Sequence, residues 1–174
     1  MNDLQSIIGD YGAFLTQIIQ ETEDEGFDLN DFVQMDHMCY RVPSLEQYKL
    51  KKKELAAVGD LLGEQQVNGR PIVAFRLRQP VLQGTWRIDC VELPAPRPGS
   101  EPKEGLEHVE FVLYDDKEAF LQKYAGKPFN LDSAERGINP EIGYKLPSGH
   151  AVKFHLLNLP TVIYLERKLG ITNV

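Results

Sequence analysis

The chain has 174 residues, of which 42% are hydrophobic and 26% charged, and a formal net charge of -7. This is the composition of a globular domain long enough to bury a substantial core. The acidic balance argues against nucleic acid or an anionic membrane as a partner, because both reward clustered Lys and Arg. No apolar run approaches the length that spans a bilayer, and no secretory signal opens the chain, so we expect a cytoplasmic protein.

An N-terminal helical extension is predicted over residues 1–33. Its apolar residues have the three-and-four spacing of a helix buried along one stripe. They are Leu4, Ile7, Ile8, Tyr11, Phe14, Leu15, Ile18 and Ile19. Gly9 and Gly12 weaken this helix slightly. We expect a packing or dimerisation helix, in a protein that is a monomer or a homodimer.

Residues 34–94 read as one module of a strand, a helix and three strands. These elements are predicted at 36–42, 44–58, 61–67, 72–77 and 85–93. Ser44 can cap the helix. Asn68-Gly69 predicts a hairpin, since both residues tolerate positive φ. Cys39 and Cys90 are too few for a disulfide framework and are expected to be reduced thiols.

A Pro-rich linker over residues 95–104 separates this module from a second one over residues 105–174. The order begins again there, with predicted elements at 107–113, 116–124, 150–157 and 161–169 and a less regular stretch before residue 146. We therefore predict a single α+β domain in which two βαβββ modules form a cupped mixed sheet.

Each module opens on an acid-histidine pair, Asp36-His37 and Glu107-His108. Because side chains alternate across a strand, His37, Cys39 and Arg41 share one face, as do His108, Glu110 and Val112. If the modules pack with approximate two-fold symmetry, His37 faces His108 across the seam.

The last strand of each module adds further candidates. His155 shares a polar face with Lys153, and laying residues 88–94 over residues 154–160 pairs Asp89 with His155. Imidazoles with a carboxylate in a cupped sheet form an open site for Fe, Mn, Ni or Zn. We predict His37, His108, His155 and Asp89 as ligands of this divalent metal ion. The carboxylate position stays open among Asp89, Glu92 and Glu110.

Basic residues on the same faces are candidates for binding an anionic substrate. They are Arg41, Arg70, Arg76 and Lys153, because guanidinium and ammonium groups pair with carboxylates. Arg41 and Lys153 are favoured because they share strand faces with His37 and His155. Salt bridges inside the cup are the competing interpretation. Glu110 is predicted to transfer a proton if it is not a ligand.

Several blocks of this sequence resemble the YecM-like family of the vicinal oxygen chelate superfamily. They are Asp36-His37, Asn68-Gly69-Arg70-Pro71-Ile72, Val91-Glu92-Leu93-Pro94, Glu107-His108-Val109-Glu110 and Lys153-Phe154-His155. The resemblance implies a metal between the modules, with ligands at the start of the first strand and within the last strand of each. His37 and His108 match the first-strand positions. The glutamate that is the usual ligand in the last strand falls near Asp89 in the first module. In the second module it falls near Lys153, so this chain departs from the family pattern there.

Two functions follow from these residues. The first is a metal-dependent isomerase, lyase or dioxygenase that acts on a small anionic substrate through two neighbouring oxygens. The alternative is a metal-free protein that sequesters a small molecule in the same cup, as bleomycin resistance proteins do. Lys153 favours this alternative, because an ammonium beside a dication is repelled. A third interpretation makes the cup vestigial and the N-terminal helix a partner-binding surface.

Overall fold

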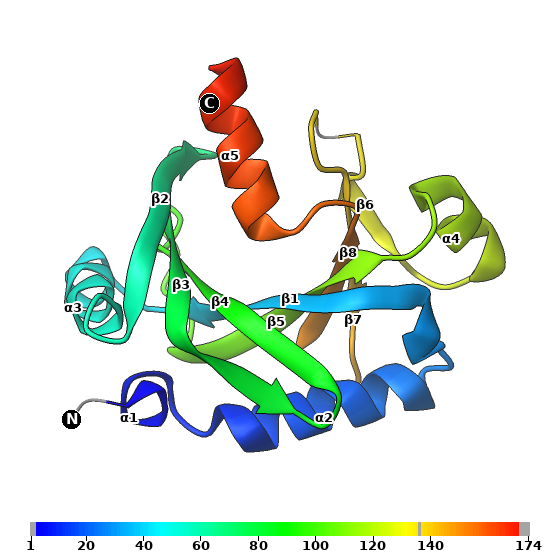
Figure 1. The fold of residues 1–174 in the computed structure, drawn as a ribbon, viewed down its shortest axis with the longest axis horizontal. Helices are drawn as coiled ribbons and strands as arrows, with labels where there is room; N and C mark the ends of the chain where they lie inside the picture. The colour runs from blue at the N-terminus through cyan, green and yellow to red at the C-terminus, as the bar shows by residue number, and fades with distance from the viewer. Residues whose placement is uncertain (1–2, 136, 171–174) are drawn as a thin grey trace.

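A computed structural model describes residues 3–135 and 137–170. Eight strands form one mixed sheet in the order β2-β3-β4-β1-β5-β8-β7-β6 (Figure 1). The strands are β1 Phe32–Arg41, β2 Gly59–Val67, β3 Arg70–Gln83, β4 Trp86–Pro94, β5 Gly105–Leu113, β6 Asn130–Ser133, β7 Glu141–Lys145 and β8 Ala151–His155. The helices are α1 Leu4–Ile8, α2 Tyr11–Asp24, α3 Leu45–Leu55, α4 Lys117–Lys123 and α5 Leu159–Leu169, with a 3₁₀ turn at Leu29–Asp31.

The predicted pair of βαβββ modules is confirmed. The first contains β1, α3, β2, β3 and β4, and the second contains β5, α4, β6, β7 and β8. β1 and β5 pair antiparallel at the seam, and each pairs in parallel with the last strand of its own module. The stretch that lacks a clear sequence pattern holds the short strands β6 and β7.

The single N-terminal helix predicted from Leu4 to Ile19 is wrong. Gly9 adopts a φ of 84°, which ends α1, and the carboxylate of Asp10 then caps α2 by accepting a hydrogen bond from the backbone N–H of Ala13. A positive φ is accessible to glycine but strained for other residues, so Gly9 acts as a helix break and not as a mild weakening. The apolar stripe continues across the break because both helices pack on the same core.

The hydrophobic core lies between the sheet and the two N-terminal helices. Met38, Phe111 and Phe154 from three adjacent strands are fully buried, and they belong to one cluster with Leu15 and Ile18 of α2. Burial of each such side chain stabilises the fold by roughly 1.5–3 kcal/mol. Figure 1 places α1 and α2 on one side of the sheet and α5 on the other. The apolar faces of the strands are thus used for the core, which leaves the polar faces for the cup.

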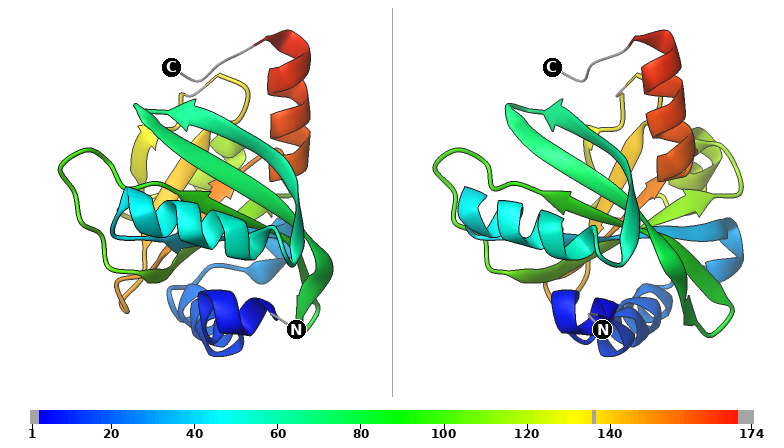
Figure 2. Two further views of the ribbon diagram at one scale, coloured as in Figure 1. Left: turned by 90° about the vertical axis from the view of Figure 1, so that its left-hand side faces the viewer. Right: turned by 60° about the vertical axis from the view of Figure 1, so that its left-hand side comes forward.

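Helix α5 stands over the open side of the cup (Figure 2). Asn158 caps it, and the backbone N–H of Leu159 donates to Asp36 of β1 at 2.7 Å. Further along, Arg167 donates to the carbonyl of Leu62, and Glu166 accepts from Gln65 of β2. The C-terminal helix therefore connects both modules across the mouth of the cup. None of the described helices is long and apolar enough to cross a membrane.

The hairpin predicted at Asn68-Gly69 is confirmed, since it joins β2 to β3 with φ values of 51° and 74°. A Cβ added at Gly69 meets no atom within 4 Å, so only its backbone conformation requires glycine.

We expect Gly69→Ala to lower the free energy of unfolding by about 1 kcal/mol, because alanine is strained at positive φ. Gly12→Ala is the matched control. Its Cβ meets Asp10 at 3.5 Å, an ordinary contact, in the first turns of α2. We expect this change to raise stability by roughly 0.5–1 kcal/mol through helix propensity. Urea denaturation measures the free energy of unfolding of both variants. Equal effects of the two substitutions would contradict the conclusion that the backbone conformation at Gly69 requires glycine.

Candidate metal centre and substrate cup

The concave face of the sheet encloses a cavity of about 850 Å³. This volume is in the range of small-molecule sites, about 300–1,000 Å³. Among the predicted site residues, the cavity is lined by His37, Arg41, His108, Glu110, Lys153 and His155. Glu92 and Arg70 line it too, so eight of the ten candidate residues named from the sequence are brought to one place, all but Asp89 and Arg76.

Glu110 lies at the centre of the cluster. Its Oε1 is 3.0 Å from Nζ of Lys153, 3.2 Å from Nε2 of His108 and 3.5 Å from Nε2 of His37. Its Oε2 is 3.6 Å from Nε2 of His155. The carboxylate is 6% exposed. Four nitrogens from four places in the sequence thus surround one buried carboxylate.

Two β-bulges turn the acid of each acid-histidine pair into the cup. Across the seam, Met35 pairs with Phe111 and His37 with Glu110, so Asp36 is an extra residue in β1. Likewise Cys39 pairs with His108 and Tyr40 with Leu106, which leaves Glu107 as an extra residue in β5. A bulge redirects the side chain of the extra residue. The repeated pair is therefore a repeated bulge, and each acid lies beside its own histidine.

These acids fix the tautomers of two histidines. Nδ1 of His37 donates to Asp36 at 3.0 Å, and Nδ1 of His108 donates to Glu107 at 3.1 Å. When Nδ1 of a neutral imidazole holds the proton, Nε2 presents a lone pair. Nε2 of each ring faces Glu110 and donates toward it while protonated; when that proton is lost, its lone pair is free for a metal, which is the arrangement of histidines that ligate a metal with a carboxylate behind them.

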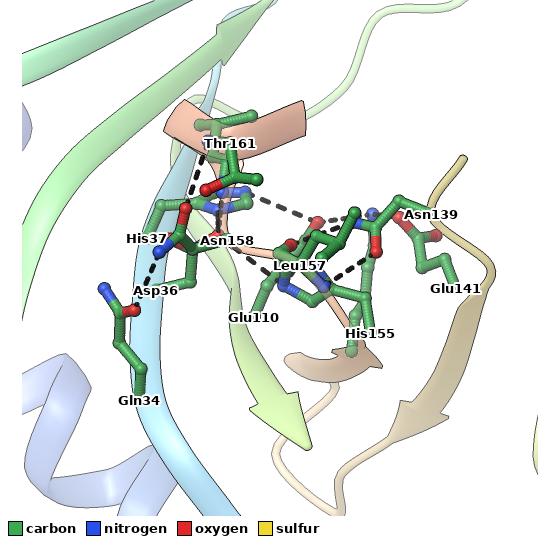
Figure 3. Close-up of polar contacts among 12 residues, drawn as sticks. Gln34, Asp36, His37, Glu110, Asn139, Glu141, His155, Leu157, Asn158 and Thr161 are labelled. Carbon is green, nitrogen blue, oxygen red and sulfur yellow. Dashed lines mark hydrogen bonds and ion pairs between the residues drawn. The ribbon is translucent and has the colours of Figure 1, made fainter. Parts of the chain in front are cut away.

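His155 has the opposite tautomer because of Asn139 (Figure 3). Oδ1 of Asn139 accepts hydrogen bonds from the backbone N–H groups of Leu156 and Leu157, at 3.2 and 3.0 Å, so its amide orientation is determined. Its Nδ2 therefore donates to Nδ1 of His155 at 2.7 Å. The proton of neutral His155 must lie on Nε2, which is 3.6 Å from both Asp36 and Glu110. This ring is arranged to donate a proton into the cup.

The charges of the cluster compensate one another. Burial alone raises the pKa of Glu110, but Lys153, followed by His37 and the hydrogen bond from His108, holds it well below its usual range. Burial alone lowers the pKa of His37, yet the charges of Glu110 and Asp36 raise it well above 6.5. Glu110 is therefore ionised at neutral pH.

Part of this cluster fits a divalent metal ion. One ligand atom from each of four residues lies within 4.8 Å of all the others, and these residues are His37, Glu92, His108 and Glu110. Two ligands of one first-row ion are roughly 3.0–3.4 Å apart, which the Nε2–Oε1 separations at Glu110 approach. In addition, Nε2 of His37 is buried and forms no hydrogen bond with a described atom. A buried imidazole nitrogen without a hydrogen bond in this position fits the ligand set of a divalent ion.

The strand register favours Glu92, and not Asp89, as the carboxylate of the candidate metal site. His37 pairs with Cys90 and Cys39 with Glu92, and the matching steps of the second module pair Glu110 with Lys153. Lys153 therefore corresponds to Glu92, so the overlay of Asp89 on His155 is wrong. Asp89 does not line the cup and forms an ion pair with Arg87 at 2.9 Å.

The basic residues fall in three places. Lys153 lies inside the cup, between Glu110 and Glu141, at 3.0 and 3.2 Å. The expected salt bridge to Asp89, Glu110 or Glu92 is therefore present for Lys153, whereas Arg41 is ion-paired with Glu107 at the cup wall, a partner outside that set. Arg70 lines the cup as well, whereas Arg76 is exposed on β3 and does not.

Four residues of the site escape the sequence patterns. Asp36 and Glu107 have the wrong parity, and only the bulges bring them inward. Asn139 and Glu141 come from the stretch without a clear periodicity. The single available signal was the acid before each histidine, because it occurs twice.

A protein-family model described as "YecM protein" matches residues 3–166. The chain belongs to the YecM family. Protein YecM of Escherichia coli (strain K12) is 32% identical over 118 residues, which cover 68% of this chain and 62% of that protein. The matched region thus spans about three fifths of the length of the curated relatives.

Two solved structures share the fold of this YecM-family chain. One, described as Protein EC4020 from structural genomics, has a TM-score of 0.74 and 27% identity, and the match covers 95% of this chain and 97% of that one. The other is methylmalonyl-CoA epimerase from Mycobacterium tuberculosis, with a TM-score of 0.50, 13% identity and coverage of 79% and 96%. The predicted vicinal oxygen chelate fold is thereby confirmed.

We expect the neutral form of His155 to carry its proton on Nε2, and Asn139→Asp to move it to Nδ1, because a carboxylate accepts where the amide donates. Long-range ¹H–¹⁵N correlation spectra of the imidazole rings distinguish the two tautomers. The signal that disappears in His155→Gln gives the assignment. Protonation of Nδ1 in the unmodified protein would contradict the role given to Asn139.

Proposed function

We propose that this protein is a divalent-metal-dependent enzyme that acts on a small anionic substrate held through two neighbouring oxygens. The candidate ligands are His37, His108, Glu110 and Glu92; His155, which the sequence predicts as a ligand, is given a proton-transfer role instead, because Asn139 donates to its Nδ1. Two imidazoles and two carboxylates suit Fe(II), Mn(II), Ni(II) or Zn(II). The observation that carries the proposal is the pair of buried imidazoles whose Nε2 atoms converge on one carboxylate while their Nδ1 atoms are held by Asp36 and Glu107.

The residues around these ligands have separate roles in the proposal. A divalent ion held there supplies Lewis-acid polarisation of a substrate carbonyl. His155 donates a proton from Nε2 to the bound substrate, or takes one up, while Asn139 fixes the orientation of its ring. Arg41 and Lys153 orient the anionic group of the substrate. A proton donor at this position favours isomerase or lyase chemistry over dioxygenase chemistry.

The alternative is a metal-free protein that binds a small anion in the same cup. Lys153 favours it, because the ammonium lies 3.0 Å from Glu110 and already compensates the carboxylate. Burial alone lowers the pKa of Lys153, but Glu110 and Glu141 raise it above its usual value, so the charge persists. In this case the cup would recognise its ligand through Lys153 and Arg41.

Metal analysis separates the two functions. We expect protein purified without an affinity tag to contain one equivalent of a divalent metal. His37→Ala, His108→Ala and Glu110→Gln should weaken metal binding by more than about 100-fold, beyond the 10–100-fold typical of residues that only orient a ligand. Asp89→Asn is the matched control and should keep the metal, because Asp89 lies outside the cup.

Elemental analysis and competition with a chromogenic chelator give stoichiometry and affinity for each variant. Protein that contains no metal, and whose thermal unfolding ignores added Mn(II), Fe(II), Ni(II) and Zn(II), would reject the enzyme and leave the sequestration function. Loss of the metal in Asp89→Asn would instead reject the ligand set.

Lys153→Met should raise metal affinity by about tenfold or more, since a like charge at this range costs on the order of 1–4 kcal/mol. The same chelator competition measures this change. Lys49→Met, on an exposed position of α3, removes the same charge far from the cup and should leave affinity unchanged. Weaker metal binding by Lys153→Met would mean that the lysine supports the site in another way.

A further inference from the structure

Arg70 is a buried cation without a carboxylate partner among the described residues. The residue is 8% exposed, its Nη1 donates to the carbonyl of Ala95 at 2.8 Å, and its Nε forms no hydrogen bond with a described atom. Burial of a charge is unfavourable unless the charge is paired. A single carbonyl does not compensate a guanidinium, so this position favours an external anion.

Two more guanidinium groups lie beside it. Burial, followed by the positive charges of Arg41 and Arg97, lowers the pKa of Arg70. All three arginines line the cup. Arg41 is paired with Glu107, whereas Arg97 is exposed and forms no ion pair with a described residue. Arg70 and Arg97 therefore carry charges that no described ion pair compensates and that the more distant carboxylate of Glu92 offsets only in part, so a bound anion would relieve their repulsion.

The backbone holds Arg70 in a fixed position. The positive-φ turn at Asn68-Gly69 precedes it, and the backbone N–H of Ala95 donates to the carbonyl of Pro71 directly after it, at 2.9 Å. A guanidinium held in this way loses little conformational entropy when it binds a ligand. Arg70 and Arg97 also line a second hollow along the Pro-rich linker, so they lie where the cup opens into this groove.

This wall adjoins the His108 side of the histidine cluster, since Glu107 contacts both Arg41 and His108, and His37 lies further away along β1. Arg41 follows His37 by four residues along β1, which corresponds to roughly 13 Å at 3.3 Å per residue. An anion at the arginines and a group at the histidine cluster could therefore be the two ends of one small molecule.

We propose that Arg70 and Arg97, with Arg41 beside them, bind the phosphate group of the substrate. Guanidinium forks match the oxygens of phosphate, and a phosphate monoester is close to a dianion at neutral pH, which suits more than one arginine. That the other end of this molecule lies at the histidine cluster rests on the proposed function. The phosphate subsite itself does not.

The test uses metal-free protein in EDTA, titrated calorimetrically with inorganic phosphate and, separately, with acetate. We expect one phosphate site and at least tenfold weaker binding of acetate. Arg70→Gln and Arg97→Gln should each weaken phosphate binding by about tenfold or more, the scale of a lost hydrogen bond to a charged group. Arg97→Gln keeps the result interpretable if Arg70→Gln fails to fold, because Arg97 is exposed.

Arg76→Gln is the matched control, since Arg76 is exposed on the strand that Arg70 begins and lines neither hollow. It should bind phosphate like the unmodified protein. Absence of saturable phosphate binding, or equal weakening by Arg76→Gln, would overturn the subsite, and acetate as tight as phosphate would overturn the phosphate assignment. Because no metal is present, these outcomes do not depend on the metal site, which Arg97→Gln should retain.

Discussion

The ionised carboxylate of Glu110, buried at the seam between the two modules, is the constraint on which the concave face depends. A carboxylate in this position requires cations or hydrogen-bond donors around it, because burial without them is strongly unfavourable. Lys153 and the Nε2 atoms of three histidines meet that requirement. Loss of Glu110 would leave these groups to repel one another, so the carboxylate organises the cluster whether or not a metal binds.

The residues behind the histidines decide what each ring can do. Asp36 and Glu107 hold Nδ1 of their histidines and so direct Nε2 inward, while Asn139 directs a proton inward from His155. Asp36 also accepts the backbone N–H of Leu159 at the start of α5. Asp36 thus contacts both His37 and the first residue of the helix over the cup. A single carboxylate therefore links the entrance of the cup to the histidine cluster.

The two modules repeat in fold but differ in charge. The matched positions of their last strands hold Glu92 in the first module and Lys153 in the second. Replacement of a carboxylate by an ammonium makes the cup less negative and weakens the attraction for a dication, but improves it for an anion. Together with the arginines on the adjoining wall, this arrangement supports the proposal of an anionic small-molecule ligand.

Local sequence determined the elements and much of the site. Alternation along the strands places His37, His108 and Glu110 on one face, and Asn68-Gly69 fixes a turn, because these features depend on neighbouring residues alone. Gly9 is different, because an isolated glycine in an apolar stripe can either weaken a helix or end it, and the local sequence does not distinguish the two.

Only the tertiary structure decided which distant groups meet. The parallel pairing of β1 with β4 selects Glu92 over Asp89, and two bulges turn Asp36 and Glu107 inward against their parity. Asn139 reaches His155 from a loop with no periodic pattern. Register, bulges and loop paths are set by packing between segments far apart in the chain, so the sequence determined the candidate residues, whereas the fold determined which of them meet and in which protonation state.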